Sequence, residues 1–437
     1  MTTQLTCTSR SYLQVDLTAV TDRRYSSGMI IRARTVATAD RPPSENGAIA
    51  VCGNQIVEAG NFHEIKARYA GQVIDLGEQA LLPGLINAHC HLDYTCLRGK
   101  IPPQKSFSDW IRAINTEKAQ LSAHDYIASI NEGFAEAKRF GTTTIANLTA
   151  FPKLIPHIHA PIRTWWFAEL IDVRAPEGAN ELVDSVLEAL DQTENWGLAP
   201  HALFTASENV YCLCEEIAHR ENILLTTHLA ESRSEMQMFH DAAGPLYEFL
   251  RHIGRPMDDC GNKTPLGVFV GASGGRALPH WIMAHLNELN ESDFELLEKS
   301  ALKFHIVHCP RSRDYFCHSQ FPLERLRALG FNICLGTDSL ASNDSLSLFD
   351  EMRAFQKSFP SAPPQETFRM VTVNPARAFR RENELGGIRP GFKADMIAVP
   401  CSGSADVFEQ IIAFDAPVAW MMVNGSVIAS VPGSAGC

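Results

Sequence analysis

Hydrophobic and polar positions follow a β-type pattern near both ends of the chain. In residues 28–82, and again in residues 383–437, short apolar runs are separated by turn signals such as Asn46-Gly47 and Asn424-Gly425. Asn-Gly pairs favour tight hairpins between strands. We therefore expect a small β-sandwich domain built from both ends of the chain. Residues 1–27 lack clear periodicity and are expected to form an N-terminal arm.

The long middle of the chain, residues 83–382, alternates between strand and helix patterns. Ser122 can cap a helix from about Ala123 to Phe140, and Gly141 can end it. Further helices are expected near residues 179–192, 214–220, 291–301 and 322–329. The eight expected strands are LLPGLINAHCH (81–91), TTTIANL (142–148), TWWFAEL (164–170), HALFTA (201–206), NILLTTHLAE (222–231), HWIMAHL (280–286), KFHIVHCP (303–310) and FNICLGTDS (331–339). This alternation predicts an α/β fold, a (β/α)8 barrel of the TIM type.

Composition and charge narrow the class of protein. The net charge is −12 and there is no basic stripe, which argues against nucleic acid as a partner. No apolar stretch approaches the roughly 20 residues that span a bilayer, and the N-terminus lacks the pattern of a signal peptide. The 12 cysteines form no CxxC pair, as is typical of reduced thiols. We therefore expect a cytoplasmic protein that has no membrane contact.

Polar residues that directly follow apolar strands carry the candidate chemistry. His89 and His91 end the first expected strand, and alternate residues of a strand share one face. Strand five ends in His228, strand six in His285 and strand eight in Asp338. Any one of these residues alone is more often structural, but active sites of barrels form where such strand ends meet. Together they offer nitrogen and oxygen ligands to one divalent metal and leave a position for water.

Five segments around these strand ends resemble those of the amidohydrolase superfamily, in its mononuclear zinc nucleoside deaminase branch. The segments are PGLINAHCHLD, THLAES, MAHLNEL, HCPRS and LGTDSLASN. The resemblance implies that His89, His91, His228 and Asp338 bind one divalent metal, usually zinc, with iron or manganese as alternatives. Two-metal members join their ions through a carboxylated lysine on strand four, where this chain has His201. A single metal is therefore expected.

The remaining groups fit hydrolytic deamination of the 6-amino group of an adenine nucleoside. Asp338 could take a proton from the attacking water, and Glu231 could protonate a ring nitrogen of the substrate. His285 could hydrogen-bond the water or the developing tetrahedral centre. The alternative for Glu231 is an acid at a helix start, where the helix dipole stabilises its charge.

The substrate is expected from segments after strands four and seven. His201 resembles a substrate-contacting histidine of the methylthioadenosine and S-adenosylhomocysteine deaminases, but HCPRSRDYFCHSQFPL departs from their pattern. Its PRS..YF.H spacing resembles members assigned to 6-amino-6-deoxyfutalosine, in the futalosine route to menaquinone. Arg311 could then bind a carboxylate, and Tyr315 or Phe316 an aromatic ring. The alternative for Arg311 is a surface or backbone-capping residue.

Other activities of the same machinery stay open. They are deamination of methylthioadenosine, S-adenosylhomocysteine, adenosine, guanine or a pterin, and hydrolysis of a triazine. A binding protein without catalysis is more remote, because such relatives usually lose metal ligands and this chain keeps all of them. The expected partners are a small nucleoside and, for assembly, a second copy of the chain in a homodimer.

Overall fold

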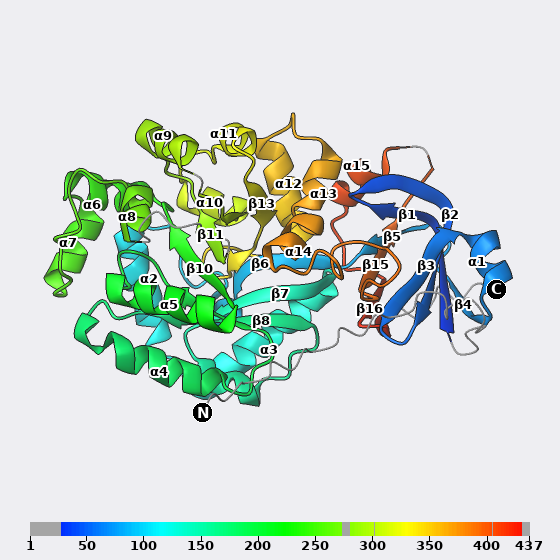
Figure 1. Ribbon diagram of the computed structural model, residues 1–437, viewed down its shortest axis with the longest axis horizontal. Coiled ribbons are helices and arrows are strands. Elements are labelled where there is room, and N and C mark those ends of the chain that lie inside the picture. Colours follow the sequence, from blue (N-terminus) through cyan, green and yellow to red (C-terminus); the bar gives the residue numbers. More distant parts are fainter. Residues whose placement is uncertain (1–27, 273–279, 301, 404, 431–437) are drawn as a thin grey trace, which may run out of the picture.

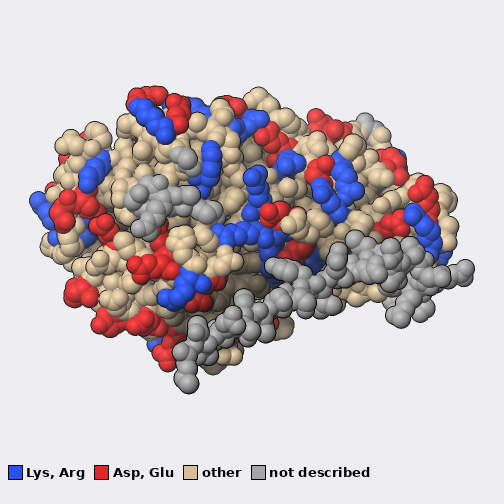
Figure 2. Space-filling view, in the orientation of Figure 1, with Lys and Arg blue, Asp and Glu red and all other residues tan. Residues whose placement is uncertain are grey.

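The computed structural model describes residues 28–272, 280–300, 302–403 and 405–430. The expected arm of residues 1–27 lies outside the described residues. The chain forms two parts that lie side by side, a curled sheet surrounded by helices and a smaller mixed sheet (Figure 1). Acidic and basic side chains are interspersed on the face of the molecule seen in Figure 2.

The larger part is built on a parallel sheet of nine strands in the order β13-β12-β11-β10-β9-β8-β7-β6-β14. The strands are β6 Leu85–His91, β7 Thr142–Thr149, β8 Arg163–Leu170, β9 Trp196–Pro200, β10 Leu224–Leu229, β11 Trp281–His285, β12 His305–His308, β13 Asn332–Leu335 and β14 Asp338–Ser339. β14 follows β13 after Gly336 and Thr337, and it pairs with β6, with Asp338 opposite Cys90. The sheet therefore curls back toward its first strand, which is consistent with the expected TIM-type barrel.

Helices surround the curled sheet (Figure 1). They are α2 Phe107–Lys118, α3 Ala123–Arg139, α4 Ala179–Leu190, α5 Glu208–Glu221, α6 Arg233–Asp241, α7 Pro245–His252, α8 Pro265–Ala272, α9 Glu291–Lys299, α10 Pro310–Phe316, α11 Leu323–Ala328, α12 Leu348–Ser358, α13 Pro364–Arg369 and α14 Val373–Ala378. The predicted cap of α3 is confirmed, because the Ser122 side chain accepts from the backbone N–H of Asp125, whose carboxylate accepts from the N–H of Ser122. This reciprocal pair satisfies two N–H groups that the helix itself leaves free.

The fourth strand lies earlier in the sequence than expected. The prediction of a strand at residues 201–206 is wrong: the strand is β9, which ends at Pro200. After it the chain turns, because the carbonyl of Ala202 accepts from the N–H groups of Thr205 and Ala206. Ser207 then caps α5, which begins at Glu208 rather than at residue 214. His201 is therefore the first residue after the strand and stays at the strand end.

The smaller part joins both ends of the chain, as predicted. Its strands are β1 Gly28–Thr38, β2 Arg41–Cys52, β3 Gln55–Asn61, β4 Gly71–Asp75, β5 Gln79–Pro83, β15 Met396–Pro400, β16 Trp420–Val423 and β17 Ser426–Ser430. The early strand β5 pairs antiparallel with the late strand β15, and Asn424-Gly425 forms the turn between β16 and β17. Hydrogen bonds place all eight strands in one mixed sheet, so the sandwich stays a prediction, as do the exact domain boundaries.

Of two further short helices, α1 Phe62–Arg68 packs against β1, β2 and β3 of the mixed sheet, and α15 Val407–Ala413 packs against α12 and α13. Within the part of the chain that the structure describes, none of the helices has the length and apolar character needed to cross a membrane.

Candidate active site

Three imidazole nitrogens and one carboxylate converge at the carboxyl ends of the strands. His91 Nε2 lies 3.3 Å from His89 Nε2 and 3.2 Å from His228 Nε2. Asp338 Oδ1 lies 3.7 Å from His89 Nε2 and 3.6 Å from His91 Nε2. Ligands about 2.0–2.1 Å from a tetrahedral zinc are separated by an edge of about 3.3 Å. The spacing of these four side chains therefore fits the ligand set of one divalent metal.

The protonation of these histidines also fits a metal site. Burial lowers the pKa of His89 and lowers that of His91 well below its ordinary value, so both rings are neutral at physiological pH. The His228 Nδ1 lies 2.7 Å from the carbonyl oxygen of His201, to which it can donate. That hydrogen bond leaves the lone pair of His228 Nε2 directed at the other rings. Lone pairs at this separation repel each other unless a cation or a proton lies between them.

Asp338 is held by its neighbours in a constrained conformation. The hydroxyls of Ser312 and Ser342 donate to Oδ2, at 2.5 and 3.2 Å, which leaves Oδ1 facing the histidines. The φ angle of Asp338 is 56°, in the left-handed region that non-glycine residues rarely adopt. Gly336 lies so close to His89 that a Cβ would come 2.7 Å from the His89 carbonyl oxygen. The approach of β14 to β6 therefore requires glycine there.

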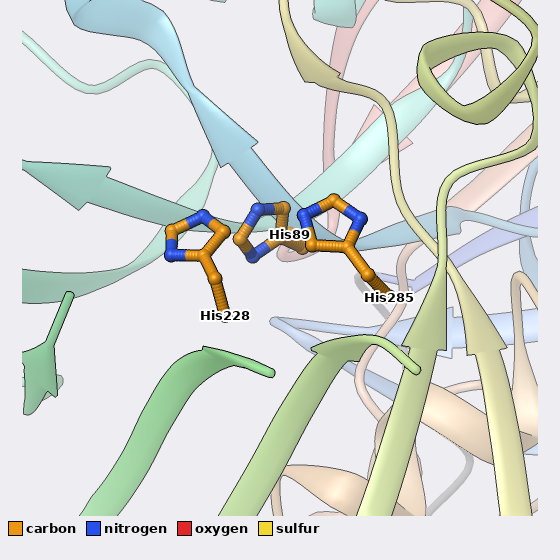
Figure 3. Close-up of side chains that lie close together, drawn as sticks. All are labelled: His89, His228 and His285. Atoms are coloured by element: carbon orange, nitrogen blue, oxygen red, sulfur yellow. The ribbon is translucent and has the colours of Figure 1, made fainter. Parts of the chain in front are cut away.

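His285 adds a fourth imidazole to the group. Its ligand nitrogen lies within 4.8 Å of those of His89 and His228, and Figure 3 shows the three rings gathered at the strand ends. Burial lowers the pKa of His285 to about 4. A neutral ring in this place can hydrogen-bond a reacting group, as expected from the sequence, and it also offers the metal a further nitrogen.

Glu231 lies beside His285, on the loop between β10 and α6. Its Oε1 is 3.9 Å from His285 Nε2 and 3.7 Å from His318 Nε2. Burial acts to raise the pKa of Glu231, but His285 and His318 outweigh it, so the pKa lies below its ordinary value. Glu231 is therefore ionised at neutral pH, and it accepts a proton before it can donate one. Its backbone N–H donates to the buried Glu235, at 2.7 Å, so the helix-start geometry is present as well.

A cavity of about 510 Å³ opens onto these groups, a size typical of sites for small molecules. The residues at or just after strand ends that line it include His91, Glu169, His201, His228, Glu231, His285 and Asp338. Much of the remaining lining is apolar, with Phe107, Trp110, Ile111, Phe204, Phe249 and Phe316. Two cationic side chains, Lys118 and Arg174, also line it. The acidic Asp172 lines it as well, so the cavity joins a polar floor to largely apolar walls that carry charges of both signs.

Arg311 and Tyr315 do not line this cavity, contrary to the expectation that they bind substrate. The Arg311 guanidinium pairs with Asp344 and lies 3.3 Å from Asp350 Oδ2, so carboxylates of the chain already meet its charge. The Tyr315 hydroxyl donates to the carbonyl oxygen of Ile101, at 2.8 Å. Phe316, the aromatic alternative to Tyr315, does line the cavity. The structure gives Arg311 and Tyr315 partners outside this cavity, and their binding of substrate stays a prediction.

Sequence reasoning missed Glu169, which lies at the end of β8 and lines the cavity. Its Oε1 is 3.6 Å from His91 Nδ1 and 3.9 Å from His201 Nε2. Burial raises the pKa of Glu169 to about 7. A carboxylate beside the second nitrogen of a ligand histidine can orient that ring. The signal in the sequence was one acid in the otherwise apolar strand TWWFAEL.

Comparison with known proteins agrees with this geometry. Residues 80–428 match the model of the amidohydrolase family. The chain therefore belongs to the amidohydrolase family, as a hydrolase that acts on carbon–nitrogen bonds. The resemblance seen in the sequence is confirmed.

Individual proteins of known name are similar to this chain in sequence or in structure. The 5-methylthioadenosine/S-adenosylhomocysteine deaminase of Syntrophobacter fumaroxidans is 29% identical over 371 residues, which cover 81% of this chain and 80% of the relative. The structure of Helicobacter pylori aminofutalosine deaminase with methylthio-coformycin has a TM-score of 0.81 at 20% identity and covers 92% of this chain and 100% of that one. A zinc-bound adenosine deaminase from Xanthomonas campestris has a TM-score of 0.75 at 22% identity, covering 92% and 93%. These two structures support the fold.

Proposed function

We propose that this protein is a metal-dependent deaminase that removes the 6-amino group of an adenine nucleoside as ammonia. The observation that carries the proposal is the close approach of His91 Nε2 to His89, His228 and Asp338, beside a cavity that also holds Glu231. The names of the related enzymes point to the same reaction. Zinc is the proposed metal, since nitrogen-rich tetrahedral sets suit it.

Each polar residue around the cavity can have a separate role in the reaction. A bound divalent metal lowers the pKa of water and so makes a nucleophile available near neutral pH. Asp338 would accept one proton of the attacking water and pass it to the departing ammonia, while Glu231, which is ionised in the free protein, would take up the other proton of that water and deliver it to the ring nitrogen beside the amino-bearing carbon. That protonation makes the carbon more electrophilic. His285 hydrogen-bonds the oxygen that is added there, and His201 contacts the nucleoside.

The preferred nucleoside is proposed to be 6-amino-6-deoxyfutalosine, which places the enzyme in menaquinone biosynthesis by the futalosine route. Phe107, Trp110 and Phe316 give the cavity an aromatic lining that suits the aromatic tail of this substrate. Arg174 is exposed on the loop after β8 and lines the same cavity, where it can bind the tail's carboxylate. Methylthioadenosine and S-adenosylhomocysteine are the second candidates, because several related deaminases are named for them. A cytoplasmic location and a homodimer stay predictions.

The experiment is a comparison of ammonia release from aminodeoxyfutalosine, methylthioadenosine, S-adenosylhomocysteine, 5′-deoxyadenosine, adenosine and guanine. The proposal expects turnover of adenine nucleosides, with the highest kcat/KM for aminodeoxyfutalosine. A preference for methylthioadenosine would replace the proposed substrate and keep the reaction. Turnover of guanine alone, with every adenine nucleoside untouched, would overturn the proposed function.

A further inference from the structure

His318, the last residue of the PRS..YF.H spacing, lies beside Glu231. Its side chain is 8% exposed, and its Nε2 lies 3.7 Å from Glu231 Oε1. That nitrogen is buried and has no hydrogen-bond partner among the described residues. An unpaired buried polar atom is costly. Its position beside the proposed proton donor therefore calls for an explanation.

The contacts around His318 fix its ring in this place. The ring stacks on Phe316, with centroids 5.0 Å apart and planes at 18°, and it meets the edge of Phe107 at 5.9 Å. The backbone N–H of His318 donates to the carbonyl oxygen of Arg313, at 3.1 Å. The next residue, Ser319, donates its N–H to Glu288 Oε1, at 3.0 Å. The ring is thus held between the aromatic lining of the cavity and Glu231.

We propose that His318 is a positioning residue that holds the Glu231 carboxyl group toward the substrate through its Nε2–H. The inference rests on the proposed function, because it concerns how Glu231 delivers its proton. A shift of less than about 1 Å brings the two atoms into the range of a charge-assisted hydrogen bond. His285 flanks the same oxygen at 3.9 Å, so the two imidazoles fix Oε1 from two residues far apart in the sequence. The side chain of Phe316, which lines the cavity, stacks on the His318 ring and restricts its movement.

Two substitutions separate the hydrogen bond from the packing. His318→Phe keeps a flat ring against Phe316 and removes the N–H, whereas His318→Gln keeps an N–H donor and loses the ring. Gln320→Ala is the matched control, since Gln320 is an exposed residue of the same segment, two positions after His318. Each variant is first assayed for bound metal, which should equal that of the wild type.

The expected result is a fall in kcat of about 10-fold or more for His318→Phe, with KM changed by less than about 3-fold. His318→Gln should recover part of the loss, and Gln320→Ala should match the wild type. In a Glu231→Gln background, His318→Phe should cause no further loss, because His318 acts through Glu231. An undiminished kcat in His318→Phe, or the same fold-loss in the Glu231→Gln background, would overturn the inference.

A crystal structure of the His318→Phe variant gives a readout that needs no substrate. We expect the Glu231 carboxylate to turn away from the cavity, while His285 stays in place. An unmoved carboxylate would contradict the positioning role. A wild-type protein that deaminates no adenine nucleoside would instead refute the proposed function, so the two failures are distinguishable.

Discussion

The strand-end cluster and the apolar lining of the cavity are built in different ways. The cluster, defined as His89, His91, His228, His285 and Asp338, is buried, and each member lies at the end of a strand whose hydrogen bonds fix its backbone. The lining brings together Phe107 and Trp110 from α2 with Phe316 from α10. Side chains at the ends of paired strands are held in one geometry by the hydrogen bonds of the sheet. A lining made by helices and loops can vary without changing the positions of those side chains. The two regions should therefore respond differently to substitution.

The largest effect should come from the cluster itself. His228→Ala removes the His228 Nε2 that lies 3.2 Å from His91 Nε2. Metal affinity should therefore fall by more than about 100-fold, which exceeds the loss typical of a residue that only orients a ligand. Activity should be lost with the metal. Elemental analysis after dialysis measures the metal that the variant retains. A variant that retained its metal would show that His228 is not a ligand.

Glu231→Gln should have the next largest effect and should leave the cluster intact. A general acid contributes about 10²–10⁴-fold to turnover, so kcat should fall by that amount while bound metal stays at the wild-type level. Steady-state kinetics beside metal analysis tests both parts. Full activity in the glutamine variant would return Glu231 to the role of a helix-start acid, which its contact with Glu235 also suits.

Substitutions in the lining should change selectivity rather than chemistry. Arg174→Ala should lower kcat/KM for a nucleoside with a carboxylate tail by about 10-fold, because a charged hydrogen bond contributes about 1.5–3 kcal/mol. Adenosine should react at its normal rate. Arg311→Ala is the control, since the Arg311 guanidinium pairs with Asp344 outside the cavity. Equal losses on both substrates in Arg174→Ala would mean that Arg174 shapes the loop instead.

The smallest effect is expected for Arg311→Ala itself. Its ion pairs with Asp344 and Asp350 are partly exposed, and such pairs contribute about 0–1 kcal/mol to the free energy of unfolding. A denaturant titration should therefore show a shift of this size or none. A selective loss of activity on anionic nucleosides would restore Arg311 to the substrate site.

The same contrast explains what could be predicted from the sequence. The strand ends were located by apolar periodicity followed by a polar residue, and this placed His89, His228 and Asp338 together across the chain. The partners of Arg311 could not be predicted in this way. Asp344 is 33 residues away in the sequence, and no local pattern indicates that its loop contacts α10.

Glu169 was missed for the opposite reason. The strand TWWFAEL is mostly apolar, and nothing in its pattern gives its single acid a partner. The partners are His91, which ends β6, and His201, which directly follows β9. The start of the fourth strand was also misplaced, since the apolar run of residues 201–206 is a buried turn rather than a strand. Local patterns thus located the strand ends, while contacts between distant loops had to come from the structure.

The central claim is that one divalent metal, held by the strand-end cluster, supports deamination of adenine nucleosides. The most direct test is to remove metal with a chelator and add zinc back in steps while ammonia release from an adenine nucleoside is followed. We predict that activity is absent without metal, rises linearly and stops rising at one zinc per chain. A break at two metals per chain, or full activity in the metal-free protein, would contradict this account.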